Sequence, residues 1–112
     1  MMTTKANEVL ENLRDNIDDV DKAIVELLAE RFEYTHKVGI TKAQHNISSI
    51  SPEREQQQMK RIASLASDNG VPPQIVQNIM RTIINEVVRQ HDQIKNSGIA
   101  ENFEDTTSDP MP

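Results

Sequence analysis

The sequence has no cysteine and no tryptophan among its 112 residues, and it has only three aromatic residues. Without cysteine, neither disulfide bonds nor thiolate chemistry is available, which suits a reducing compartment. A net charge of −6 and the scarcity of aromatic side chains argue against nucleic-acid binding, which requires a basic face or a stacking platform. The sequence also lacks an apolar run of membrane-spanning length and an apolar signal segment near its N-terminus. We therefore expect a cytoplasmic protein without nucleic-acid or membrane partners.

Helix-breaking residues are scarce in the first part of the chain. From Ala6 to Gln44 there is one glycine, Gly39, and no proline. Apolar residues recur there in alternating steps of three and four residues, which places them on one stripe of an α-helix. The stripe residues are Leu10, Leu13, Ile17, Val20, Ile24, Leu27, Tyr34 and Val38. The sequence therefore predicts one uninterrupted helix over this range.

The length of this helix has a consequence for assembly. At 1.5 Å per residue it would span about 58 Å, whereas a compact domain of about 100 residues has a radius of gyration of about 13 Å. The rest of one chain is too small to cover such a helix, so the exposed part of its stripe needs a second copy of the chain. We expect an intertwined homodimer.

Two further helices are predicted from residues that start and stop helices. Ser51 and Pro52 form an N-cap and a first-turn residue, and the Asp-Asn-Gly segment 68–70 is a stop in which glycine is the left-handed cap. Pro72-Pro73 opens a third helix, which has two adjacent apolar stripes and continues to about Lys95.

The whole sequence therefore predicts an all-α fold class of three helices with a very long first helix. After Asn96 the periodicity and most of the apolar content are lost, and acidic residues occur without any lysine or arginine. We expect one helical domain over residues 1–96 and an acidic disordered tail over residues 97–112.

Arg31 occupies the stripe position between Leu27 and Tyr34, where an apolar side chain would be the default. A guanidinium buried there needs an anionic partner, and no acidic residue stands three or four positions away. The partner could be a ligand. The alternative is an arginine whose apolar stem is buried while its charged end stays in water.

Other polar residues fall on related faces. Lys42 follows Arg31 by eleven residues, so at 100° per residue the two cations lie within about 20° of the same helix face. Arg14 lies about 100° away from that face, so in an intertwined dimer it would point toward the site of the other subunit. On the third helix His91 comes one turn after Val87, and it would face the interior of the bundle.

The second helix contributes two charges in its first turn, Arg54 and Glu55, of which Glu55 is placed to accept a hydrogen bond. Each polar residue also has a purely structural alternative, such as an ion pair of Arg14 with Asp18 or a solvent-exposed Lys42. Taken together, cations on converging faces favour a small dianion held by two arginines, one from each subunit. The three histidines have no spacing that would place two metal ligands on one helix face, so no metal site is predicted.

Five segments resemble the all-helical chorismate mutases: LRDNIDDVD at 13–21, LLAER at 27–31, VGITK at 38–42, PERE at 52–55 and GVPP at 70–73. Their spacing matches that family without insertions from Leu13 to about His91. The resemblance is greatest to the mutase domains attached to prephenate dehydrogenases.

The resemblance implies a domain-swapped dimer of three-helix chains with two shared sites. It implies conversion of chorismate to prephenate by a Claisen rearrangement in phenylalanine and tyrosine biosynthesis, without a cofactor. A further enzyme of the shikimate pathway is a candidate partner. In such a reaction the protein must hold the substrate folded and stabilise charge that develops on the breaking ether oxygen.

The resemblance also implies roles for residues at matching positions. Arg31, together with Arg14 of the other subunit, would bind the two carboxylates, and Lys42 would donate to one carboxylate and to the ether oxygen. Glu55 would accept a hydrogen bond from the ring hydroxyl.

Arg54 would support this arrangement by pairing nearby, and the backbone around Ser51 would help to close the site.

Two residues depart from the family pattern, because His91 stands where a glutamine or glutamate usually donates to the ether oxygen, and Val87 replaces a serine or threonine. An imidazolium donates from either ring nitrogen, so we expect activity to rise as the pH falls through about 6.5. Loss of the hydroxyl at position 87 predicts lower activity than is usual in the family.

Two alternatives compete with the mutase. An isochorismate pyruvate lyase would be similar in fold and in its cationic site, although the link from His45 to Ser51 is longer than is usual for that enzyme and favours the mutase. A non-catalytic helical dimer could serve as a regulatory or docking module whose site has decayed at Val87 and His91. The retained cations argue against the module, because a structural dimer gains nothing from cations at stripe positions.

Overall fold

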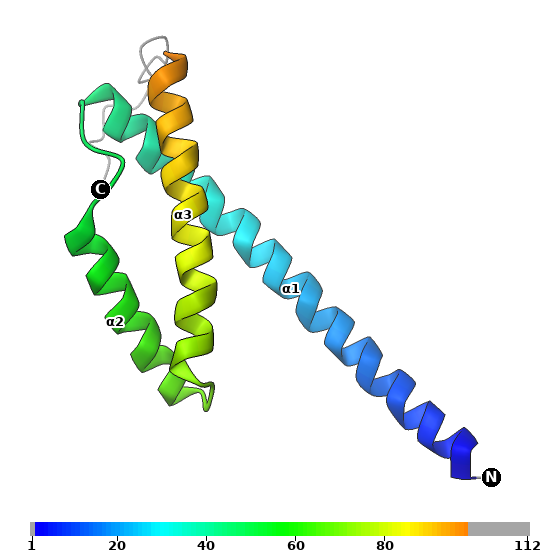
Figure 1. Cartoon of the computed structure of the whole chain (residues 1–112). Coiled ribbons are helices and arrows are strands. Elements are labelled where there is room, and N and C mark those ends of the chain that lie inside the picture. The colour runs from blue at the N-terminus through cyan, green and yellow to red at the C-terminus, as the bar shows by residue number, and fades with distance from the viewer. Residues whose placement is uncertain (1, 99–112) are drawn as a thin grey trace. The chain divides into compact units, whose positions relative to one another are not determined.

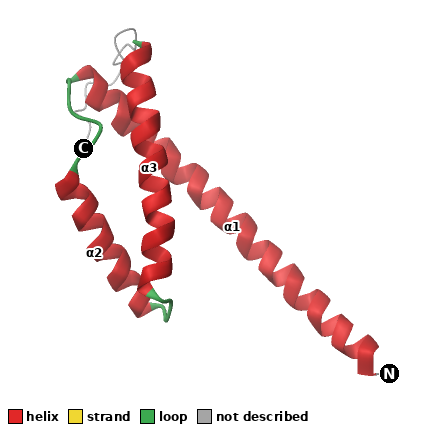
Figure 2. Cartoon of the chain, in the orientation of Figure 1, coloured by secondary structure: helices red, strands yellow, loops and turns green. Residues whose placement is uncertain are grey.

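The computed structural model describes residues 2–98, with side chains from Thr4 onward. This part of the chain contains three helices and no strand (Figures 1 and 2). The helices are α1 (Met2–Gln44), α2 (Pro52–Asp68) and α3 (Pro73–Ser97). The all-α fold class with a very long first helix is confirmed. The acidic tail predicted from residue 97 lies, from residue 99 on, outside the described residues.

The first helix begins earlier than predicted, at Met2, and ends at Gln44 as predicted. The chain divides into two units, Met1–Tyr34 and Thr35–Pro112. The first unit contains most of α1, and the second contains the last turns of α1 together with α2 and α3. None of the described helices is both long and apolar enough to cross a membrane.

The stripe residues of the first unit are largely exposed. Their exposed fractions run from 45% for Leu10 to 63% for Leu27, and Leu13, Ile17, Val20, Ile24 and Tyr34 fall between these values. Within this unit the described residues form a single helix, so no second element is present to cover the stripe. An amphipathic helix in water is stabilised mainly by burying such a face.

The second helix starts and stops at the residues that predict its ends. Ser51 is the N-cap with an extended backbone, and Pro52 is the first helical residue. The Ser51 side chain makes no capping hydrogen bond, and its carbonyl accepts from the Glu55 amide at 3.0 Å. At the other end, Gly70 has a φ of 69°, which is the left-handed conformation that glycine adopts without strain.

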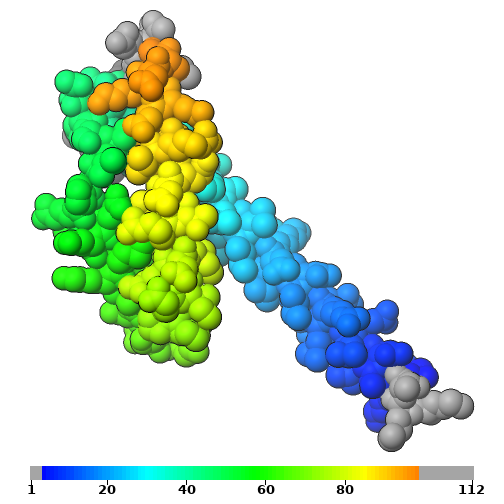
Figure 3. All heavy atoms as spheres, viewed as in Figure 1, coloured from blue at the N-terminus to red at the C-terminus, as the bar shows by residue number. Residues whose placement is uncertain are grey.

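The helices α2 and α3 are neighbours that contact each other, and they come closest near the turn that joins them (Figures 1 and 3). Ala66 from α2 and Ile84 from α3 are buried. The Gln77 amide nitrogen on α3 donates to the Met59 carbonyl on α2 at 3.3 Å. The two helices form an antiparallel hairpin whose turn is the short link between Asp68 and Pro73.

The last turns of α1 pack against the end of α3. Ile40 and Ile94 form a buried cluster with Ala43 against it. Gly39 is buried between these helices, and a Cβ atom there would lie 2.5 Å from Cδ2 of His91 and 2.9 Å from Cδ1 of Ile94. Because no side chain fits in that space, the close approach of the two helices depends on glycine.

Candidate active site

His91 is the buried polar residue of the second unit, with 5% of its surface exposed. Its Nε2 atom lies 2.7 Å from the carbonyl oxygen of Thr35 on α1. A carbonyl only accepts, so Nε2 carries the proton and donates. The other ring nitrogen, Nδ1, is buried and has no hydrogen-bond partner among the described residues. In the neutral ring the single N–H group therefore donates its hydrogen bond to the Thr35 carbonyl of α1.

Burial lowers the pKa of His91 below its ordinary value, because the charged ring would lose its hydration. The hydrogen bond to Thr35 opposes this effect, whereas the nearby positive charge of Lys42 adds to it. The neutral ring therefore persists below pH 6.5. The rise in activity predicted as the pH falls through about 6.5 stays a prediction, and because the pKa of His91 is lowered we now expect such a rise only at a lower pH.

Lys42 lies in the last turn of α1 and is partly buried. Its carbonyl accepts from the amide of Ile47 at 2.7 Å, which turns the chain back after the helix. No described carboxylate forms an ion pair with its ammonium group. Because this charge acts on His91, the structure brings together two of the residues that sequence reasoning assigned to the ether oxygen.

Glu55 lies in the first turn of α2 and is partly buried. Its Oε1 atom accepts a hydrogen bond from Nη1 of Arg81 on α3 at 2.5 Å, and the two side chains form an ion pair. Sequence reasoning missed Arg81. No signal in the sequence alone points to Arg81, because its place opposite Glu55 follows from the register of the two packed helices. Gln77 on α3 contacts Met59 on α2, Arg81 lies one turn after Gln77, and Glu55 lies one turn before Met59.

Gln58 follows Glu55 by three residues, on the same side of α2. Its side-chain oxygen is buried and has no hydrogen-bond partner among the described residues. An unsatisfied buried acceptor costs about 1–3 kcal/mol, so this oxygen is a further candidate contact for a ligand. Gln58 stands in a run of three glutamines, and nothing in that run distinguishes it from its neighbours.

The remaining candidates of the second unit differ in exposure. Val87 and Ser51 are partly buried, whereas Arg54 is exposed. No described residue forms an ion pair with Arg54, and the supporting role expected of it in the site stays a prediction. Val87 lies one turn before His91 on α3, and both side chains turn away from solvent as their spacing predicts.

The two arginines expected to bind carboxylates belong to the first unit. Arg14 is exposed and makes no ion pair with Asp18, so the structural alternative for Arg14 is not formed among the described residues. Arg31 is partly buried, and its Nη1 atom has no contact with solvent.

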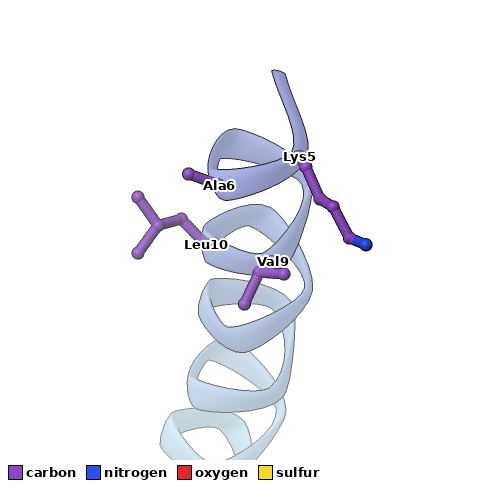
Figure 4. Close-up of a pocket in the computed structure, with 4 residues that line it drawn as sticks. All are labelled: Lys5, Ala6, Val9 and Leu10. Atoms are coloured by element: carbon purple, nitrogen blue, oxygen red, sulfur yellow. The ribbon is translucent and has the colours of Figure 1, made fainter. Parts of the chain in front are cut away.

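Figure 4 shows a hollow in the first turns of α1, lined by Lys5, Ala6, Val9 and Leu10. Three of the four lining residues are apolar and all four are exposed, so this surface continues the apolar stripe and lacks the paired cations that a dianion requires. Within the described part of the chain, no group of three or more His, Asp or Glu side chains could hold a metal ion.

Comparison with known proteins identifies the family. The model of the chorismate mutase type II family matches residues 13–92. The T-protein of Enterobacter agglomerans is 38% identical over 74 residues, which are 66% of this chain and 20% of that protein. A 4-amino-4-deoxychorismate mutase of Streptomyces pristinaespiralis is 29% identical over 83% of this chain and 72% of its own length.

A chorismate mutase of Methanocaldococcus jannaschii is 34% identical over 77 residues, which are 69% of this chain and 78% of that protein. The chain thus spans about a fifth of the T-protein and most of the two smaller relatives. The matched range begins one residue before Arg14 and ends one residue after His91, so it contains every candidate site residue named from the sequence. This chain belongs to the chorismate mutase type II family.

Proposed function

We propose that this protein is a chorismate mutase, an isomerase that converts chorismate to prephenate in the biosynthesis of phenylalanine and tyrosine. The observation that carries the proposal is the family match over residues 13–92, within which Arg14, Arg31, Lys42 and Glu55 all stand at the positions that the resemblance assigns to substrate. The cytoplasmic location expected from the sequence remains a prediction.

The proposed working form is a domain-swapped homodimer with two shared sites. Its support is the exposed apolar stripe of α1, in which Leu13, Ile17 and Val20 are each more than half exposed. Fully burying such a side chain contributes about 1.5–3 kcal/mol, so covering the stripe with the same stripe of a second copy stabilises the pair by several kcal/mol. In this dimer Arg14 of one subunit reaches the site of the other.

In the proposed mechanism the protein forms no covalent bond with the substrate. Arg31 and the second subunit's copy of Arg14 bind the two carboxylates and hold the substrate in its folded, reactive conformation. As the ether bond breaks, negative charge develops on its oxygen, and the Lys42 ammonium stabilises that charge more strongly than it stabilises the ground state.

The hydrogen bond from His91 to Thr35 changes the role proposed for the histidine. With its Nε2 proton donated to a backbone carbonyl, neutral His91 presents an acceptor nitrogen and has no N–H group for the ether oxygen. Lys42 is then the donor to that oxygen, and His91 holds the end of α1 in place. The replacement of the usual amide or carboxylic side chain by His91 therefore predicts a slower enzyme than is usual in the family.

The ring substituent of the substrate is proposed to contact Glu55. The Streptomyces relative is named for 4-amino-4-deoxychorismate, which carries an amino group in place of the ring hydroxyl. Whether a member of the family accepts chorismate or 4-amino-4-deoxychorismate therefore depends on the protein group that faces the ring substituent. We propose that the substrate of this protein is the hydroxyl compound.

The proposal is tested by following chorismate consumption with purified protein and separating the products by chromatography. Replacing Lys42→Gln should lower the rate about 100-fold or more, as loss of a donor to a developing oxyanion does. Lys60→Gln, which removes an exposed lysine on α2, is the matched control and should keep full activity.

Three results would contradict the proposal. Full activity in the Lys42→Gln variant would remove this residue from the mechanism. Release of pyruvate from isochorismate, without turnover of chorismate, would identify the lyase. Absence of turnover of both compounds by a folded dimer would leave the non-catalytic module.

A further inference from the structure

The ion pair between Arg81 and Glu55 joins two different helices. The residues are 26 positions apart, and Nη1 of Arg81 lies 2.5 Å from Oε1 of Glu55. The Glu55 side chain is 22% exposed and that of Arg81 is 47% exposed. The carboxylate is therefore partly shielded from water, while the guanidinium reaches it from the solvent side.

A comparison with a second ion pair on α3 shows what is particular about this one. Arg89 pairs with Glu86, three residues before it on the same helix and with no proposed contact to substrate. Arg81, by contrast, crosses from α3 to the residue that the proposed function assigns to the ring substituent. Since pairs this exposed contribute little to folding stability, the consequence of the Arg81 pair is expected mainly at the site.

In this ion pair Glu55 can still accept a hydrogen bond through Oε2, but the negative charge of its carboxylate is compensated by the Arg81 guanidinium. Only Oε1 is engaged by Arg81, and no described residue donates a hydrogen bond to Oε2. A ring hydroxyl needs only an acceptor, and Oε2 provides one. A ring ammonium needs uncompensated negative charge, and the Arg81 guanidinium has already compensated that of Glu55 and would itself repel a second cation.

We propose that Arg81 is a specificity-determining, positioning residue. By pairing with Glu55, it makes the site select a neutral hydroxyl over a cationic amino group at the ring position that Glu55 contacts. This inference rests on the proposed function, since it takes from it the contact between Glu55 and the ring. Arg81 does not touch the substrate and acts through the carboxylate.

The test compares two substrates, chorismate and 4-amino-4-deoxychorismate, whose allylic amine is largely protonated at pH 7. The full-length protein and its Arg81→Gln variant are assayed with each, and the ratio of the two kcat/KM values is determined. Removing the guanidinium should shift this ratio toward the amino compound by about tenfold, because an opposite charge within a few ångströms then faces the ammonium without compensation. The change should appear mainly as a lower KM for the amino compound.

Two controls separate this role from a structural one. Arg89→Gln removes an arginine from the other ion pair of α3 and should leave the ratio unchanged. In a Glu55→Gln background, Arg81→Gln should no longer alter the ratio, because the carboxylate through which Arg81 acts is gone. A merely structural arginine would lower both kcat/KM values together and leave their ratio unaltered.

The outcomes also separate this inference from the proposed function. If the protein converts chorismate and the ratio does not move in Arg81→Gln, the role of Arg81 is refuted while the mutase stands. If the protein converts neither compound, the dissociation constants of both compounds are measured by calorimetry. The ratio of these two constants should then shift toward tighter binding of the amino compound in Arg81→Gln, again by about tenfold. Failure to bind either compound would refute both proposals.

Discussion

At the scale of the residue, His91 is the point where packing and the proposed chemistry meet. Its ring is buried at 5% exposure, donates from Nε2 to the Thr35 carbonyl, and keeps Nδ1 without a partner among the described residues. The same ring occupies the space in which a side chain at Gly39 would have to fit. A residue tied to the backbone in this way acts first as a link between α1 and α3.

The protonation of His91 predicts how stability depends on pH. Burial lowers the pKa of the folded-state ring below the value of about 6.5 that it has in the unfolded chain. Below pH 6.5 the unfolded chain therefore binds more protons, so the free energy of unfolding decreases as the pH falls from about 6.5 toward the folded-state pKa, by at most about 1.4 kcal/mol per pH unit. Above pH 6.5 the contribution of His91 is fully present.

This dependence is measured by urea denaturation between about pH 7.5 and pH 5, on either side of the unfolded-state pKa. The His91→Gln variant should lose the decrease attributable to this ring, whereas His45→Gln, a change at an exposed position, should retain it. Identical pH profiles for the wild type and His91→Gln would show that the ring is not buried in its neutral form.

At the scale of the element, the contact between the end of α1 and the end of α3 depends on a glycine. Gly39 lies inside α1, where glycine is unfavourable by about 1 kcal/mol relative to alanine. A Cβ atom at this position would lie 2.5 Å from the His91 ring and 2.9 Å from the Ile94 side chain, and both distances are below van der Waals contact. The stabilisation gained from packing the two helices this closely therefore outweighs the lower helix propensity of glycine at this position.

Replacing Gly39→Ala should destabilise the protein, although alanine is the better helix former. The added methyl group would overlap the His91 ring and displace α3, and such overpacking costs about 1–3 kcal/mol. Thermal denaturation followed by circular dichroism should show a lower midpoint for this variant. Asn85→Ala, at an exposed position of α3, is the control and should not lower the midpoint. An unchanged or higher midpoint for Gly39→Ala would mean that the helices do not approach this closely.

At the scale of the whole molecule, the candidate residues divide between the two units of the chain. Arg14 and Arg31 belong to the first unit, whereas Lys42, Glu55 and His91 belong to the second. In the first unit, α1 exposes its apolar stripe. The proposed dimer covers this stripe and assembles each site from both chains, so it accounts for the exposed surface and for the position of Arg14 together.

Subunit mixing tests the shared site. Arg14→Ala and Arg31→Ala should each be inactive alone, because every site then lacks one carboxylate-binding arginine. After the two variants are mixed, unfolded and refolded together, random pairing makes half of the dimers mixed, and one of the two sites in each is intact, so about a quarter of the sites are restored. Recovery of activity in this mixture is the expected result.

The control mixes Arg31→Ala with Lys42→Gln, whose residues are proposed to serve the same site from the same chain. Mixed dimers of this pair contain no intact site and should stay inactive. Equal recovery in both mixtures, or none in either, would contradict the assignment of Arg14 to the neighbouring subunit's site.

Features that depend on local chemistry were predictable from the sequence alone. The end of α1 at Gln44, the start of α2 after Ser51 and the left-handed Gly70 follow from residue types within a few positions of each boundary. The inward orientation of His91 followed from its spacing after Val87. The family followed from short segments at matching spacings, since the match covers residues 13–92.

Only the tertiary structure determined which groups form ion pairs and hydrogen bonds with one another. The ion pair of Arg81 with Glu55 and the hydrogen bond of His91 to Thr35 join residues 26 and 56 positions apart, and no local pattern encodes such a distance. The resemblance assigned His91 to the ether oxygen, and that role stays a prediction. The structure adds a hydrogen bond from its Nε2 to the Thr35 carbonyl and a burial that lowers its pKa. Periodicity determines which face of a helix turns inward, but the partner found there depends on the register between helices, which only the packed structure determines.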